Sequence, residues 1–177
     1  LNICALISNV TAENWLAEDG VMSILMPQSL LFQQSYEGYR NFELYGGRRL
    51  YFQEIIDWSK SGHPFSPVQQ LFCTYIIANT KRDYEKGIPL KFVQLNKGNK
   101  LERIKNLITE NNFGDYFTIT NGVVGKASES RSAFTYARNR EELYAFNAIT
   151  GESGYIGREG VEYYPQELQL LMLRGEN

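Results

Sequence analysis

Basic and aromatic residues are interleaved between residues 126 and 140, a composition suited to contact with nucleic acid. Cationic side chains bind phosphates, and neighbouring groups can read the edges of bases. A solvated charged face has the same composition, so the pattern taken alone fits either interpretation. The residues concerned are Lys126, Arg131, Phe134, Tyr136, Arg138 and Arg140.

Further cations stand beside glycines at two other points of the chain. Arg48 and Arg49 follow a glycine pair where a helix is predicted to end, so their charge suits either the carboxyl end of the helix dipole or a phosphate. Arg158 lies in the segment GESGYIGREG, residues 151–160, and is a further candidate for DNA contact. No helical pattern follows that segment, which favours a loop over a phosphate cradle.

The sequence offers little for metal or acid–base chemistry. With one histidine and two cysteines, no metal site is predicted. Cys4 and Cys73 each sit in an apolar run, which indicates buried reduced thiols, with a disulfide as the alternative. His63 has no nucleophile or acid near it and is interpreted as a loop residue rather than a general base.

The elements that would position these residues begin with a helix and a strand. Apolar residues recur at helical spacing and predict one helical face, with the helix ending near Gly20. Residues 21–26, which end at Pro27, are predicted to form a strand buried on both sides, as in a parallel sheet. The apolar helical positions are Ile3, Leu6, Ile7, Val10 and Leu16.

The pattern then indicates a second helix and an antiparallel pair of strands. Helical spacing predicts a helix over residues 36–44. Two segments rich in β-formers, 51–58 and 67–79, are separated by a glycine- and proline-rich loop and predict an antiparallel pair at the edge of the sheet.

A charged connector at residues 81–87 is the predicted boundary between two domains, residues 1–83 and 84–177. Beyond it we expect a strand at 90–95 and then a helix opened by a capping box of Asn99 and Glu102. Next we expect a hairpin with a type I′ turn at Asn121-Gly122. A strand at 133–137 and a helix opened by Asn139 and Glu142 follow.

The composition is that of a folded globular chain, with 14% aromatic residues. The net charge of −2 argues neither for nor against nucleic acid, because a local basic face can exist on a neutral average. No apolar run approaches the ~18 residues of a membrane span, and no secretory start is present. We therefore predict a cytoplasmic location and no membrane partner.

The segment GVMSILMPQSLL, residues 20–31, followed by SYEGYRNFEL, residues 35–44, resembles the catalytic domain of adenine-specific DNA methyltransferases. In that family a glycine, an apolar strand and a Pro-x-Ser/Thr turn precede a helix that carries an arginine. The resemblance covers residues 1–80 well and the rest loosely. The matching positions are Gly20, Val21, Pro27, Ser29, Leu30, Tyr39, Arg40 and Phe42.

The resemblance implies an α/β fold: the C-terminal half of a Rossmann-like methyltransferase sheet with an antiparallel closing strand, followed by an α+β extension that starts a target-recognition region. It implies S-adenosylmethionine as methyl donor and the exocyclic amine of a flipped adenine in double-stranded DNA as acceptor. Arg158-Glu159-Gly160 and Tyr163-Tyr164-Pro165 resemble an element of larger restriction-modification methyltransferases.

The family's catalytic tetrapeptide, (N/D)PP(Y/F), and its glycine-rich donor turn do not occur in this sequence. We therefore expect no catalytic residue in the chain. We expect it to be part of a longer enzyme, inactive and without donor on its own, with a restriction or specificity subunit as a candidate partner.

The resemblance also implies the rim of a target-base pocket, formed by Pro27 and Ser29 on one side and by Pro64 and Phe65 on the other. In the family, a loop before the last strand carries an aromatic residue to the back of the flipped base, and Phe65 stands at that place. The alternative is that Phe65 only plugs the edge of the core. A different class of function, a non-catalytic α/β binding or scaffold module, fits the same elements.

Overall fold

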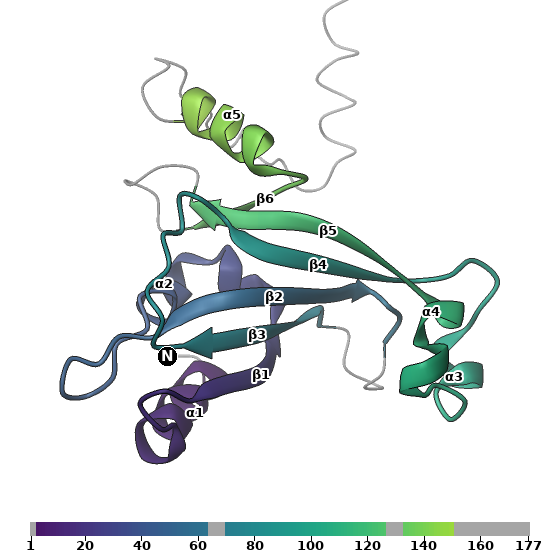
Figure 1. Cartoon of the computed structure of the whole chain (residues 1–177), viewed down its shortest axis with the longest axis horizontal. Coiled ribbons are helices and arrows are strands. Elements are labelled where there is room, and N and C mark those ends of the chain that lie inside the picture. Colours follow the sequence, from purple (N-terminus) through teal and green to yellow (C-terminus); the bar gives the residue numbers. More distant parts are fainter. Residues whose placement is uncertain (1–2, 64–69, 127–132, 151–177) are drawn as a thin grey trace, which may run out of the picture.

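In a computed structural model of the chain, residues 3–63, 70–126 and 133–150 are described, and they form one mixed six-stranded sheet. The order across the sheet is β1-β3-β2-β4-β5-β6 (Figure 1). Among these strands, β2 and β4 pair in parallel and all other neighbours pair antiparallel. The predicted α/β class is thus confirmed as a mixed open sheet with helices. The strands are β1 Val21–Pro27, β2 Tyr51–Lys60, β3 Phe72–Ala78, β4 Ile88–Leu95, β5 Phe117–Lys126 and β6 Phe134–Ala137.

β3 lies between β1 and β2 and runs antiparallel to both, so β1 and β2 run in the same direction. The predicted antiparallel pair of β2 and β3 is therefore confirmed, but its place at the edge of the sheet is wrong, because β3 is an interior strand. The prediction that β1 is buried on both sides is also wrong. Val21 and Leu25 are 66% and 43% exposed, while Met22 and Met26 on the other side of the strand are buried.

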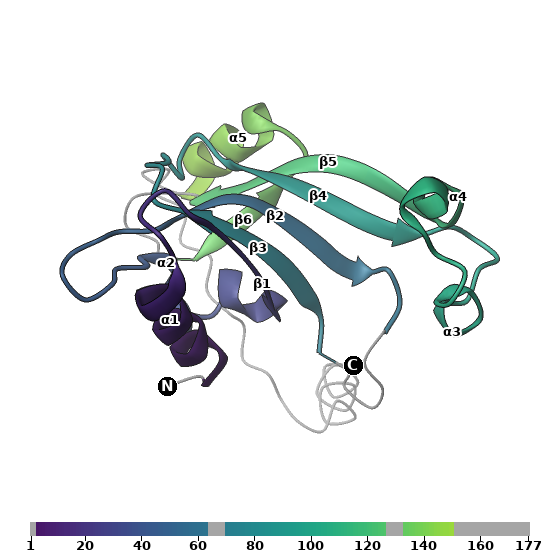
Figure 2. The same ribbon diagram turned by 60° about the horizontal axis from the view of Figure 1, so that its bottom comes forward.

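Five helices accompany the described sheet (Figures 1 and 2). α1 lies beside β1, α3 and α4 lie together at one end of the sheet, and α5 packs on β5 and β6. A short 3-10 helix, Gln28–Leu31, follows β1 directly. The helices are α1 Ile3–Trp15, α2 Glu37–Arg40, α3 Leu101–Ile104, α4 Phe113–Tyr116 and α5 Arg140–Thr150.

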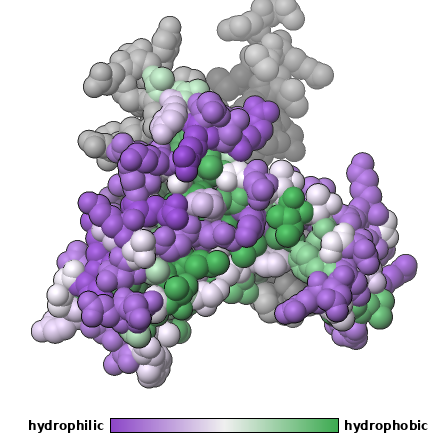
Figure 3. Space-filling view, viewed as in Figure 1, coloured by the Kyte–Doolittle hydropathy of each residue, from purple (hydrophilic) through white to green (hydrophobic). Residues whose placement is uncertain are grey.

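The two faces of the sheet are covered unequally. On one face, which we call the core face, buried aromatic residues from distant parts of the chain stack on one another: Phe52 contacts Tyr84 and Phe134, with ring centroids 6.1 and 6.2 Å away. On the other face, a small cluster of Val93, Ile104 and Phe117 lies under α3. We call this second face the open face. The strand residues of the open face include Val21, Leu25, Ile56, Trp58, Phe72 and Thr74. Figure 3 shows apolar patches on the surface of the molecule from the viewpoint of Figure 1.

The apolar stripe of α1 faces solvent, contrary to the prediction that it forms the buried face of the helix. Four of its five members, Ile3, Leu6, Ile7 and Val10, are between 47% and 67% exposed, and only Leu16, just past the end of the helix, packs against the core. Ser8 and Ala12 are completely buried in their place. Their small side chains let the helix approach the core closely, and the hydroxyl groups of Ser8 and Tyr39 are hydrogen-bonded there. The helix ends at Trp15, before the predicted end near Gly20.

The helix predicted for residues 36–44 is only one turn long. The chain reverses after α2: the amide of Leu50 donates to the carbonyl of Phe42, and that of Leu44 donates to Arg48, each at 2.8 Å. Gly46 makes the reversal with a φ of 88°, a conformation that favours glycine. The spacing of apolar residues there is therefore that of an extended segment that turns back.

The hairpin predicted at Asn121-Gly122 does not form, because β5 runs straight through both residues. A type I′ turn needs positive φ at both positions, and neither residue has it. Gly122 serves close packing instead. A Cβ at this position would lie 2.9 Å from the carbonyl oxygen of Ala137 in β6 and 3.0 Å from the Phe92 ring.

The helix predicted after Asn99 is only one turn long, α3, and a separate turn, α4, follows after a loop. Lys100, not Asn99, is the N-cap of α3, and it makes no side-chain cap hydrogen bond. Thr109 and Asn112 form the reciprocal capping contact before α4. In the last predicted helix, α5, Asn139 Oδ1 accepts the Glu142 amide at 2.8 Å, as the predicted cap requires.

The predicted domain boundary at residue 83 falls in the connection between β3 and β4. Residues on both sides of it contribute strands to the same sheet, since β4 pairs with β2. Tyr84 in this connection is buried, and its hydroxyl oxygen accepts the amide hydrogen of Phe52 at 3.0 Å. The connector is thus part of the main core.

Candidate functional site

The carboxyl ends of β1 and β2 lie on the same side of the sheet because the two strands run in the same direction. In α/β sheets, ligands bind beyond the carboxyl ends of such strands. The turn after β1 is held in place from two sides: the Tyr75 hydroxyl donates to the Pro27 carbonyl at 3.0 Å, and Arg40 donates to the Leu30 carbonyl at 2.7 Å and to Gln33 at 2.8 Å.

Arg40 is 1% exposed, an unusual degree of burial for an arginine. Burial lowers the pKa of its guanidinium, and the nearby Glu37 acts in the opposite direction. Carbonyl oxygens of the turn receive its hydrogen bonds, so the arginine matched by the family resemblance holds the turn after Pro27 in a fixed shape. It is a positioning residue and not a phosphate contact.

A polar cluster lies on the core face at these strand ends. It consists of Gln28, Asp57, Cys73 and Tyr136, from the turn after β1 and from β2, β3 and β6. Asp57 is 1% exposed, and its two carboxylate oxygens accept hydrogen bonds from Gln28 Nε2 at 2.8 Å and from the Ser59 amide at 2.7 Å. Tyr136 joins the cluster with its hydroxyl oxygen 3.4 Å from Gln28 Nε2 and 3.6 Å from the Cys73 sulfur.

Burial governs the protonation of this cluster. It raises the pKa of the Cys73 thiol to about 12, and the charge of Asp57 adds to the effect. Burial also raises the pKa of the Tyr136 hydroxyl, with further contributions from Cys73 and Asp57. Both groups therefore stay protonated at neutral pH, and the cluster carries the negative charge of Asp57 without an ion-pair partner among the described residues.

A pocket of about 420 Å³ opens on the opposite side, the open face, at the same end of the sheet. Trp58 follows Asp57 in β2, so its side chain points to the other face, and its indole N–H donates to Thr74 at 2.9 Å. Phe113 of α4 and Phe117 at the start of β5 line the pocket, as do His63 and Gln70. The volume and the apolar lining are typical of small-molecule pockets.

The predicted base-pocket rim is described in part. Pro27 is buried at the end of β1, paired with Phe72 of β3. Ser29 is half-buried in the 3-10 helix and shares a side-chain hydrogen bond with Tyr36. Pro64 and Phe65 lie outside the described residues, as do the candidate DNA contacts Arg131 and Arg158.

Arg48 lies at the end of a helix, although not of the predicted one. Its guanidinium donates to the carbonyls of Leu16 and Ala12, at 3.0 and 3.3 Å, beyond the carboxyl end of α1. Arg49 is exposed, with its guanidinium carbon 5.4 Å from the centroid of the Tyr51 ring.

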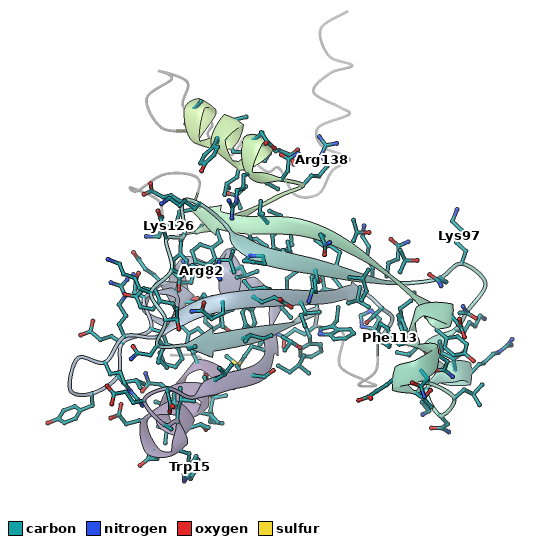
Figure 4. The ribbon with its side chains drawn as sticks, viewed as in Figure 1. Trp15, Arg82, Lys97, Phe113, Lys126 and Arg138 are labelled. Atoms are coloured by element: carbon teal, nitrogen blue, oxygen red, sulfur yellow. The ribbon has the colours of Figure 1, made fainter. Side chains whose placement is uncertain are left out.

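The remaining candidate DNA contacts lie around β5, β6 and α5. Figure 4 shows Lys126 and Arg138 in this part of the molecule, away from Trp15 at the end of α1. Arg138 and Arg140 are exposed, and the guanidinium of Arg138 is 3.1 Å from the carboxylate of Glu142. Tyr136, predicted with them, points instead into the polar cluster, where its ring contacts Phe32 and Phe92 edge-on.

Sequence reasoning did not single out Gln28 or Asp57. Gln28 is the variable position of the Pro-x-Ser turn, and such a position carries no weight in a motif match. Asp57 had a usable signal, since it is the acidic residue in the apolar run IIDW of a predicted strand. A buried carboxylate needs hydrogen-bond donors, so this residue predicts a polar cluster.

In the part of the chain that the structure describes, no helix is long and apolar enough to cross a membrane. Within those same residues, no three His, Cys, Asp or Glu side chains come together as metal ligands would. No protein-family model matches the sequence, and no curated protein is significantly similar to it.

Proposed function

We propose that this chain is part of an adenine-specific DNA methyltransferase of a restriction-modification system. Residues 1–83 would form the carboxyl-terminal half of a Rossmann-like catalytic sheet, and the remainder would begin the target-recognition region. The methyl donor, S-adenosylmethionine, and the catalytic tetrapeptide would be held by other parts of the enzyme. Because the chain lacks them, we expect it to be inactive by itself.

The observation that carries this proposal is the fixed turn after β1. Pro27, Ser29 and Arg40 were matched to the family by sequence alone, and in the fold the Arg40 guanidinium holds this turn through two carbonyl oxygens. A fixed turn beyond the carboxyl end of a strand is what the wall of a ligand site requires. The carboxyl end of β2 lies on the same side of the sheet.

A second observation supports membership of a larger sheet. The apolar stripe of α1 is exposed next to β1, whose outer edge pairs with no described strand. An exposed apolar face beside an open strand edge is costly in a finished fold and marks a surface that another element covers. Under the proposal, the neighbouring strand and helix of the catalytic domain cover it.

One observation supports the alternative function, a non-catalytic α/β binding or scaffold module: a single core continues across the predicted domain boundary. Tyr84, Phe52 and Phe134 pack together across the predicted domain boundary, which is the behaviour of one self-contained folding unit. The apolar pocket on the open face would then be the binding site of the module.

DNA binding by the 177-residue chain discriminates between the two functions. The methyltransferase proposal predicts weak affinity for duplex DNA that falls steeply with salt. Replacing both Arg138 and Arg140 with Ala should lower the affinity at every sequence and reduce the slope of log K against log salt by about 2. The matched control replaces Lys97 and Lys100 with Ala, since both are exposed cations at the α3 end of the sheet.

The outcomes separate cleanly. No binding of duplex DNA at low salt favours the scaffold module, whereas equal loss in the two double mutants removes the arginines from the interface but keeps the enzyme class. The coding sequence upstream gives an independent test. Without a glycine-rich turn after a strand and an (N/D)PP(Y/F) tetrapeptide there, the methyltransferase proposal fails.

A further inference from the structure

The amide of Gln28 has one orientation in this fold. Asp57 Oδ2 is a carboxylate acceptor, so the group 2.8 Å from it must be the NH₂ of the Gln28 amide and not its oxygen. The Tyr136 hydroxyl, 3.4 Å away, is a second partner for the same nitrogen. Gln28 Oε1 is therefore turned away from Asp57, and none of the described residues donates a hydrogen bond to it.

The charge around this oxygen selects the kind of ligand. Asp57 is buried, and no lysine or arginine of the described residues pairs with it. A phosphate or carboxylate would be repelled, whereas a neutral group with N–H donors would be attracted to Oε1, because the carboxylate polarises the amide through its N–H.

An exposed aromatic ring lies against Tyr136, the second partner of the Gln28 amide. Phe32, two residues after the matched turn's Leu30, is 38% exposed, and its ring centroid is 5.2 Å from that of Tyr136. Gln28 itself is only half-buried. A planar ring could thus lie on Phe32 while an N–H on its edge reaches Oε1, as amide side chains and aromatic rings do when they hold unstacked bases.

We propose that Gln28 Oε1, held by Asp57 and Tyr136, is a fixed hydrogen-bond acceptor for the exocyclic amine of a nucleobase that lies against Phe32. The inference rests on the proposed function, whose substrate is such an amine, and it assigns a binding role to a residue of this chain. Asp57 and Tyr136 act through Gln28 and are positioning residues.

The test is an NMR titration of the isotope-labelled 177-residue chain with deoxyadenosine and, in parallel, with purine deoxyriboside, which lacks the amine. Deoxyadenosine should shift the side-chain amide of Gln28 and the backbone amide of Phe32. Gln28→Met, which keeps the length of the side chain, should weaken deoxyadenosine binding about three- to tenfold, the effect of one hydrogen bond, and leave the purine analogue unchanged. Tyr136→Phe should give a smaller loss in the same direction.

The experiment separates this inference from the proposed function. If deoxyadenosine binds and Gln28→Met weakens its binding, but the wild type does not bind duplex DNA, the acceptor role of Gln28 is supported and the DNA methyltransferase proposal is rejected. Duplex DNA binding without any shift at Gln28 or Phe32, or equal affinity for both nucleosides in the wild type, overturns the role of Gln28. The backbone spectrum of each variant shows directly whether it is folded.

Discussion

The hydroxyl oxygen of Tyr136 lies 3.4 Å from Nε2 of Gln28, although the two residues are 108 positions apart in the chain. The contact fastens β6 to the turn after β1 across the core face, over Cys73 of β3 and Asp57 of β2. A substitution in β6 is therefore expected to alter the turn after β1, which the family resemblance identifies. The stability of that turn depends on residues that are distant in the sequence.

Replacing Arg40 with Ala should destabilise the fold by about 2–4 kcal/mol, because the buried carbonyl of Leu30 and the part-buried carbonyl of Gln33 lose their donor. The free energy of unfolding from urea denaturation measures it. Arg40→Lys should recover only part of the loss, since an ammonium cannot reproduce the planar donor geometry. Arg103→Ala, at an exposed position of α3, is the control and should change stability by less than about 0.5 kcal/mol. Equal effects at the two positions would contradict the burial of Arg40.

Replacing Gly122 with Ala should cost about 1–3 kcal/mol, because the added methyl group meets the Ala137 carbonyl and the Phe92 ring. Gly114→Ala is the matched control: nothing lies within 4 Å of its Cβ position, and it sits in α4, where Ala is the better helix former. Thermal unfolding of both variants measures the difference. If Gly122→Ala were neutral, β6 could not lie against β5 as described.

Thiol reagents should distinguish the two cysteines. Cys4 is half-buried and should react with the reagent in the native protein at pH 8. Cys73 is buried and the pKa of its thiol is raised to about 12, so it should react only after unfolding. A colorimetric thiol count should therefore give one fast group in buffer and two in denaturant. The Cys4→Ser variant identifies the reactive thiol, and a fast reaction that persists in it would show that Cys73 is accessible.

The exposed stripe of α1 should promote self-association of the chain. Replacing Leu6 and Val10 with Glu should lower the sedimentation coefficient at high protein concentration and leave the unfolding free energy within about 1 kcal/mol, because both residues are 47% exposed. Ala12→Glu, on the buried side of the same helix, should instead unfold the protein. Similar stability losses on both sides of α1 would refute the orientation of the helix.

Most elements of the fold follow from local sequence. The presence of α1 and β1, the start of α5 and the pairing of β2 with β3 were predictable because helical spacing, β-rich runs and the Asn139 cap act within a few residues. The direction in which an element points was less predictable. The stripe of α1 has the right period for burial, yet Ser8 and Ala12 are the buried residues of the helix, and Ser8 is hydrogen-bonded to Tyr39 in the core.

The glycines show why turns were misplaced. Asn121-Gly122 is a strong turn signal, but the glycine is needed for the approach of β6, a requirement set by residues more than ten positions away. Of the residues at the candidate site, the motif named Pro27 and Ser29, and Tyr136 was predicted as a DNA contact and not as a member of a polar cluster. The hydrogen bond between Gln28 and Asp57 depends on the order of the strands in the sheet, which cannot be predicted from local sequence patterns.

The place of β3 between β1 and β2 sets an order for biosynthesis. During translation, β1 emerges from the ribosome before its described partner strand, which consists of residues 72–78. Until these residues have emerged, the edge of β1 that pairs with β3 is open to chaperones and proteases. A nascent chain stalled before Phe72 should therefore be cleaved within β1, whereas one extended past Ala78 should resist.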